Sequence, residues 1–122
     1  MTRDAQFTDK MTKFSLWIRA NCRDSKTGLS LTNLDFVVTD YKKKTIVLLE
    51  EKTHMGDIHY GQQQIVGVLV KALENYEKVS DWKFKGFYLV QFLGDGPEEG
   101  KPLFINGEEK TVDDLRKLID EI

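Results

Sequence analysis

Two runs of apolar and β-branched residues, 34–39 and 45–52, lie close together in the sequence and constrain the fold more than any other feature. Strands favour such residues, and the polar segment 40–44 between the runs is typical of a turn. We therefore expect an antiparallel hairpin. Because a two-stranded hairpin is marginal alone in water, the rest of the chain has to supply further strands or helices to cover it.

The segments on either side of this hairpin supply both kinds of element. Apolar residues recur every three or four positions over residues 4–19 and again over residues 58–79, which predicts two helices. Residues 85–93 and 103–105 are typical of strands, and Thr111 with two aspartates after it predicts the start of a last helix. The expected fold is an α/β protein of the α+β type in the order α-β-β-α-β-β-α, with a mixed central sheet of about four strands flanked by helices.

Each predicted helix has an apolar face that should pack in the core. The first helix presents Phe7, Met11, Phe14 and Ile18, with Trp17 beside them. The second presents Ile58, Ile65, Leu69, Ala72, Tyr76 and Val79, and the last presents Leu115, Leu118, Ile119 and Ile122. Gln62 falls on the apolar face of the second helix, where a buried amide needs hydrogen-bond partners.

Length and composition favour one domain, residues 1–122. The net charge of −2 excludes a globally cationic nucleic-acid binder but allows a local basic patch. The single cysteine, Cys22, excludes an intramolecular disulfide. No apolar run approaches the ~18 residues of a transmembrane helix, and the N-terminus lacks the apolar segment of a secretion signal. We therefore expect a cytoplasmic protein with no membrane contact.

The hairpin brings charges of both signs to one end of the sheet. Side chains alternate between the faces of a strand, so Glu50 and Lys52 share a face. If Asp40 opposes Thr45, the same register places Asp35 opposite Glu50. Two carboxylates that close repel each other unless a cation lies between them. Mg²⁺ and Mn²⁺ bind such oxygen ligands together with waters and phosphates, so the hairpin predicts a metal site beside a lysine.

These residues resemble the motif of the PD-(D/E)xK nuclease superfamily. Fourteen residues separate Asp35, in a strand, from the run Glu50-Glu51-Lys52, and a helix with Gln62-Gln63-Gln64 near its start follows. The likeness extends over roughly residues 4–93, with Leu34 standing where the family's name has proline. It implies a restriction-endonuclease-like core and a metal-dependent hydrolase of phosphodiester bonds in DNA, acting as an endonuclease.

The resemblance also implies roles for individual residues. It makes Asp35, Glu50 and the backbone carbonyl of Glu51 ligands of Mg²⁺ or Mn²⁺, and it makes Lys52 the catalytic lysine. Gln62 is the glutamine we expect to face the site. The neighbouring Gln63 and Gln64 remain alternatives, because helix starts vary by one or two residues.

Other features of the sequence bear on ligands and partners. Many members of the superfamily carry an acidic residue on the first helix, for which Asp4 and Asp9 are available. Lys42, Lys43 and Lys44 in the predicted turn are candidates for contacts with DNA phosphates, although such a turn is often merely solvated.

Two expectations concern function and assembly. The alternative to a nuclease is a catalytically inactive module of the same fold that binds nucleic acid or a protein. Because one site cuts one strand at a time, a nuclease of this size is expected to form a homodimer. The first helix, with Trp17, and the last helix, with Ile119 and Ile122, are the candidate interfaces.

Overall fold

A computed structural model describes residues 13–22 and 34–122 of the chain. The chain divides into two compact units, Met1–Asn33 and Leu34–Ile122, and each is described by itself. In the first unit the described helix is α2, Lys13–Asn21. The rings of Phe14 and Trp17 stack with centroids 6.4 Å apart, and both are exposed. The predicted core position of Phe14 is therefore not seen in the described residues. The predicted helical residues 4–12 lie outside the described part.

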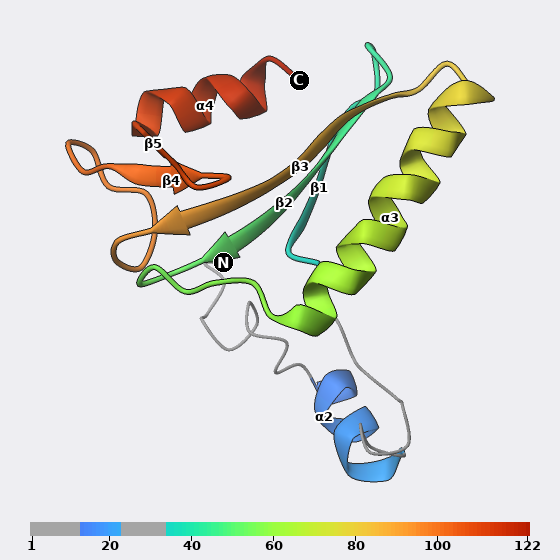
Figure 1. Cartoon of the computed structure of the whole chain (residues 1–122), viewed down its shortest axis with the longest axis horizontal. Helices are drawn as coiled ribbons and strands as arrows, with labels where there is room; N and C mark the ends of the chain where they lie inside the picture. Colours follow the sequence, from blue (N-terminus) through green and yellow to red (C-terminus); the bar gives the residue numbers. More distant parts are fainter. Residues whose placement is uncertain (1–12, 23–33) are drawn as a thin grey trace. The chain divides into compact units, whose positions relative to one another are not determined.

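The second unit is built on a five-stranded mixed sheet (Figure 1). Its strands, in both sequence and spatial order, are β1 Phe36–Asp40, β2 Thr45–Lys52, β3 Lys83–Phe92, β4 Leu103–Ile105 and β5 Glu108–Lys110. The β2 and β3 strands run parallel, and every other neighbouring pair is antiparallel. The predicted mixed sheet, with both parallel and antiparallel pairs, is thus confirmed.

The register of the first hairpin agrees with its predicted geometry. Asp40 pairs with Thr45, and Phe36 pairs with Leu49. The turn closes with Lys44 at a φ of 58°, in the left-handed region that tight turns require. Asp35 lies immediately before β1 instead of within it, which leaves its side chain at the end of the paired ladder.

The sequence predicted about four strands, and the additional one is β5. Asn106 and Gly107 have φ values of 51° and 85°, which suit a two-residue hairpin turn between β4 and β5. The side-chain oxygen of Asn106 also accepts a hydrogen bond from the Leu89 amide at 2.8 Å. Sequence patterning missed β5 because its residues are polar and show no apolar alternation.

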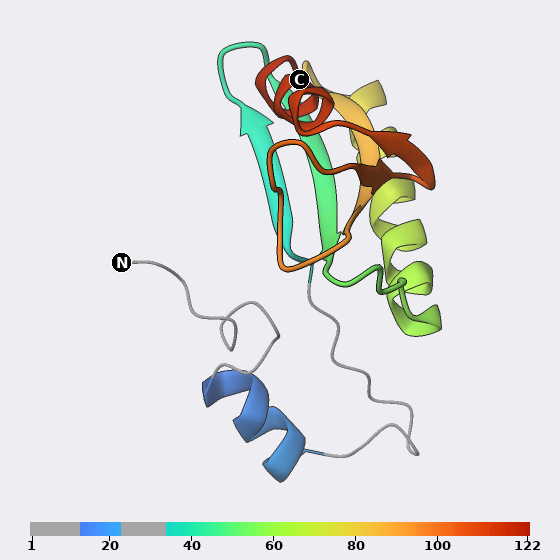
Figure 2. The same ribbon diagram turned by 90° about the vertical axis from the view of Figure 1, so that its left-hand side faces the viewer.

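Two helices, α3 (Tyr60–Lys78) and α4 (Val112–Asp120), cover opposite faces of the sheet (Figures 1 and 2). The unit containing the sheet therefore has two helices instead of the three predicted for one domain. The side chain of Thr111 accepts a hydrogen bond from the Asp114 amide at 3.1 Å, so the predicted start of the last helix is confirmed. The core under α4 contains Val47, Leu49, Val90, Phe92, Leu103, Ile105, Leu115 and Ile122.

The predicted core face of the second helix is wrong in part. Ile65, Ala72, Tyr76 and Val79 are exposed, whereas Gln62 is buried as predicted. The α3 sequence is apolar over more than half of its circumference, so periodicity alone did not fix which part faces the sheet. None of the helices in the described part of the chain has the length and apolar character needed to cross a bilayer.

Candidate functional site

The carboxyl end of β2 carries the charged cluster. Glu50 is a core residue, with only 1% of its surface exposed, although its neighbours along the strand are mainly apolar. Lys52, the last residue of β2, lies on the same face, and its ammonium is 3.4 Å from a Glu50 carboxylate oxygen. A carboxylate buried to this degree needs a countercharge and hydrogen bonds, and this site provides both.

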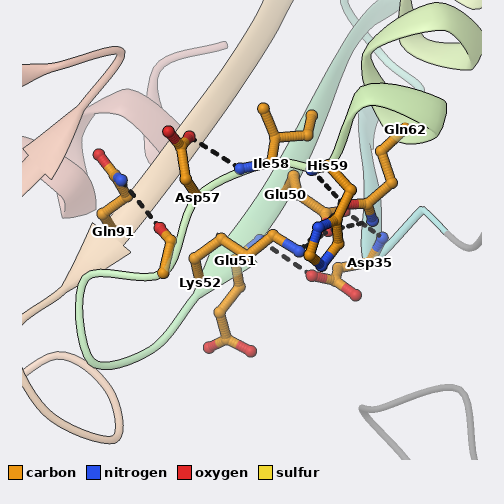
Figure 3. Close-up of polar contacts among 10 residues, drawn as sticks. Asp35, Glu50, Glu51, Lys52, Asp57, Ile58, His59, Gln62 and Gln91 are labelled. Carbon is orange, nitrogen blue, oxygen red and sulfur yellow. Dashed lines mark hydrogen bonds and ion pairs between the residues drawn. The ribbon is translucent and has the colours of Figure 1, made fainter.

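The Glu50 carboxylate accepts hydrogen bonds from two further elements (Figure 3). Its Oε1 accepts from the Asp35 amide at 3.3 Å, and its Oε2 accepts from Gln62 Nε2 at 2.9 Å. The hairpin supplies the first donor and α3 supplies the second. Both oxygens of Glu50 are therefore already engaged by the protein.

Asp35 and Glu50 are brought together as the hairpin register predicts. The Asp35 carboxylate accepts a hydrogen bond from the Glu51 amide at 2.9 Å, while the Asp35 amide donates to Glu50. These two side-chain bonds extend the β1–β2 pairing past the last ladder residue. The repulsion expected between the two carboxylates is offset here by the nearby Lys52 ammonium.

Gln62 connects the acidic and basic parts of the cluster. Its Oε1 accepts hydrogen bonds from Lys52 Nζ at 3.0 Å and from the His59 amide at 3.3 Å, while its Nε2 donates to Glu50. These contacts fix the orientation of the amide. The bond from His59 also caps the start of α3, so Gln62 serves the helix end and the charged cluster together.

The other two glutamines do not join this network. Gln63 and Gln64 are both exposed, and Gln64 donates to the hydroxyl of Tyr60 at 3.0 Å. Of the three glutamines, the structure therefore brings Gln62 to the charged cluster.

The three turn lysines lie at the opposite end of β2 from Lys52. Seven residue steps along a strand correspond to about 23 Å. Lys43 reaches the backbone carbonyl of Ile122 at 3.5 Å, and Lys44 pairs with Asp81 at 3.4 Å. The structure therefore does not bring Lys42, Lys43 and Lys44 to the carboxylate cluster.

The turn is organised by an aspartate. Asp40 Oδ1 accepts hydrogen bonds from the amides of Lys42 and Lys43, each at 2.9 Å. The bond from the Lys43 amide is the main cause that lowers the pKa of Asp40 below its ordinary value of 3.8.

Sequence reasoning missed Gln91, which the pairing of β2 with β3 sets beside Lys52. Gln91 of β3 is the register partner of Lys52 and donates to the Gly56 carbonyl at 2.8 Å. His54, in the loop after β2, contacts Asp95 at 2.7 Å through its Nε2. The alternation of β3 placed Gln91 on one strand face, but nothing in the sequence showed that this face meets Lys52.

The supply of metal ligands is limited to what the hairpin offers. Among residues 13–22 and 34–122, no group of three or more histidine, cysteine or acidic side chains is arranged to hold a metal. The acidic residues expected from the first helix, Asp4 and Asp9, lie outside the described residues. Asp35 and Glu50 are the acidic side chains that hydrogen bonds bring together at the end of β2.

Comparison with known proteins identifies a relative of the chain. A protein of Archaeoglobus fulgidus is 31% identical over 103 residues, which are 84% of this chain and 67% of the archaeal protein. That relative is described as an uncharacterized protein, so it assigns no activity. No family model and no solved structure matches the chain.

Proposed function

We propose that this chain, which belongs to the same family as the Archaeoglobus fulgidus protein, is a metal-dependent endonuclease that hydrolyses phosphodiester bonds in DNA. The observation that carries the proposal is the bridge by Gln62, which accepts from Lys52 at 3.0 Å and donates to Glu50 at 2.9 Å. A salt bridge at a strand end does not require a buried amide from the next helix. A nuclease site resembling the PD-(D/E)xK type does use this combination of side chains.

The donor set suits a hard divalent cation. Asp35, Glu50 and the Glu51 carbonyl would hold Mg²⁺ or Mn²⁺, which prefer oxygen ligands and often take only one or two carboxylates with waters and phosphates. When bound, such an ion lowers the pKa of a water and stabilises negative oxygen atoms. The protein would contribute the fixed orientation of its two carboxylates.

Lys52 is the residue that would act on the phosphate. Its stem is buried and its ammonium is held by Gln62 and Glu50, so the positive charge is oriented before any substrate arrives. A preoriented charge offsets negative charge that develops on a phosphoryl group more effectively than a mobile one. The Gln62 amide would maintain that orientation during the reaction.

One observation favours the alternative function, a catalytically inactive module of the same fold. Both Glu50 oxygens already accept hydrogen bonds from within the chain, so binding a metal would require them to exchange partners. In that case the Asp35, Glu50 and Lys52 cluster would have a structural role, and the chain would bind nucleic acid or a protein without cutting.

Cleavage of supercoiled plasmid DNA separates the two functions. We expect nicking with Mg²⁺ that chelator abolishes and that Lys52→Ala removes. Lys44→Ala makes the same change in charge beyond the opposite end of β2, and it is expected to keep activity. Equal cleavage by the Lys52→Ala protein, or none by the wild-type protein, would reject the nuclease.

A nuclease with one such site per chain would act on duplex DNA as a homodimer. Of the proposed interface residues, Ile122 is buried in the core and is excluded, whereas Trp17 and Ile119 are exposed. Light scattering at micromolar concentration is expected to give a mass near twice the 14.1 kDa of one chain. A monomer mass combined with double-strand cleavage would mean two successive, independent cuts.

A further inference from the structure

The loop that joins β2 to α3 begins directly after Lys52 and has an unusual backbone. His54 and Met55 have φ values of 51° and 56°, in the left-handed region that residues with a Cβ rarely adopt. The other two non-glycine residues with positive φ in the described chain, Lys44 and Asn106, lie in hairpin turns. Two left-handed residues in succession persist only where the surrounding contacts hold them.

The contacts that hold this backbone come from the end of β3. The His54 amide donates to the Gly94 carbonyl at 3.0 Å, and the Met55 amide donates to the Phe92 carbonyl at 2.8 Å. Both left-handed residues are thus tied to the strand that runs parallel to β2. The loop is therefore fixed relative to β3 as well as to β2.

Gln91 makes the remaining connection between β3 and the loop. It pairs with Lys52 in the β2–β3 register, so the two side chains point to the same face of the sheet. Its Nε2 donates to the Gly56 carbonyl at 2.8 Å, a bond drawn at the labelled Gln91 in Figure 3. Gln91 itself is half-buried, uncharged and remote enough from Glu50 to share no hydrogen bond with it.

Gly56 in turn lies against the side chain of Lys52. A Cβ placed on Gly56 would be 3.7 Å from Lys52 Cβ and 4.0 Å from Lys52 Cδ. The glycine backbone therefore packs directly on the aliphatic stem of the lysine. Beyond that stem, the Lys52 ammonium donates to Gln62 at 3.0 Å.

We propose that Gln91 is a positioning residue for Lys52. By holding the Gly56 carbonyl, Gln91 keeps the loop on the lysine stem and so keeps the ammonium between Gln62 and Glu50. Its effect on cleavage rests on the proposed function, whereas its effect on the position of Lys52 does not. The residue touches neither the phosphate nor the carboxylates and acts only through Gly56.

Reductive methylation of lysines, quantified for each residue by mass spectrometry, tests this position directly. Gln91→Met keeps the side-chain length and removes the donor. We expect it to raise the methylation rate of Lys52 about two- to tenfold, the factor to which one hydrogen bond corresponds. The rate of Lys44, which is exposed at the far end of β2, should not change.

Gly56→Ala provides an independent variant, because its methyl group would lie only 3.3 Å from the Thr53 carbonyl, so the loop that covers the Lys52 stem has to shift. The same selective rise at Lys52 is expected even though Gln91 is intact, and this result carries the test if Gln91→Met does not fold. An unchanged Lys52 rate in a folded Gln91→Met protein would overturn the proposal. So would a rise of Lys52 and Lys44 by the same factor, which indicates general loosening.

Cleavage kinetics separate this proposal from the proposed function. In an active enzyme, Gln91→Met should lower kcat by a similar two- to tenfold factor while KM and Mn²⁺ affinity stay unchanged, because Lys52 is not a metal ligand. If the wild-type protein does not cut DNA, the nuclease fails while a selective rise at Lys52 still supports the positioning role. Normal kcat in a folded Gln91→Met protein would reject the positioning role of Gln91 and leave the proposed nuclease function standing.

Discussion

The two ends of β2 each carry a lysine paired with a carboxylate at the same distance. Lys52 and Glu50 are 3.4 Å apart, and so are Lys44 and Asp81. The side chains of the first pair are 12% and 2% exposed, whereas those of the second are 48% and 84% exposed. Water screens the second pair strongly, whereas the first pair is largely shielded from it. Burial, and not separation, therefore decides what each pair contributes.

The two ends also differ in how many elements hold them. Glu50 receives hydrogen bonds from the residue before β1 and from α3, so its pair with Lys52 is fixed from several directions. At the other end the Asp40 carboxylate accepts hydrogen bonds from two turn amides, and the turn lysines are exposed. A site that must orient charge needs the first kind of arrangement.

The largest expected effect is the loss of the buried cation. Lys52→Met leaves the Glu50 carboxylate buried without its countercharge, which should lower the free energy of unfolding by about 3–5 kcal/mol. Denaturant unfolding followed by circular dichroism measures this. The double variant Glu50→Gln/Lys52→Met should be less destabilised than Lys52→Met alone, because no isolated charge remains. A loss below about 1 kcal/mol for Lys52→Met would show that the buried pair contributes no more to stability than an exposed pair does.

A second change separates metal binding from stability. Asp35→Asn keeps an oxygen acceptor for the Glu51 amide, so unfolding should change by only about 1 kcal/mol. The heat of Mn²⁺ binding in titration calorimetry should disappear, because one of the two ligand carboxylates is gone. Asp40→Asn at the opposite end is the matched control and should bind Mn²⁺ normally. Unchanged binding by the Asp35→Asn protein would remove Asp35 from the metal site.

The exposed pair should respond weakly. Lys44→Met removes the partner of Asp81, yet both groups remain solvated, so the free energy of unfolding should fall by at most about 0.5 kcal/mol. Denaturant unfolding of the Lys44→Met and Lys52→Met proteins at the same salt concentration measures the two losses. A loss as large as that of Lys52→Met would mean that distance alone sets the strength of these pairs.

The smallest expected effect is a pH dependence at the lysine turn. The hydrogen bond from the Lys43 amide lowers the pKa of Asp40 below 3.8 in the folded protein. The stability that Asp40 contributes is therefore present above pH 3.8 and is lost as pH falls through its lower folded pKa. Unfolding curves of wild-type and Asp40→Asn proteins should converge as the pH falls below this value. A constant difference down to pH 2 would show that the charge of Asp40 plays no part.

The parts of the site that lie close in sequence were predictable. The hairpin register follows from the turn length, so the meeting of Asp35 with Glu50 could be counted from the sequence. The buried position of Gln62 followed from a polar residue interrupting an apolar helix face. The shared face of Glu50 and Lys52 was also predictable, because side chains two residues apart on a strand point to the same side.

The parts that depend on distant pairing were not predictable. Neither the β2–β3 register, which sets Gln91 beside Lys52, nor the left-handed backbone of His54 and Met55 has a local sequence signal. The third omission, β5, is a polar edge strand that lacks apolar alternation. Apolar periodicity also failed on α3, because Ile65 and Val68 extend its apolar arc beyond the face that meets the sheet.

The parallel pairing of β2 with β3 has a consequence for the order in which the protein folds. Asp35 and Glu50 belong to one hairpin, which closes a short loop, and hairpins form in roughly 1–10 μs. Lys52 meets Gln91 only after the crossover through α3 has formed, and such non-local contacts form late and slowly. We therefore expect the acidic half of the site to assemble before the half that restrains its lysine. During refolding, amide exchange should protect Glu51 before it protects Met55.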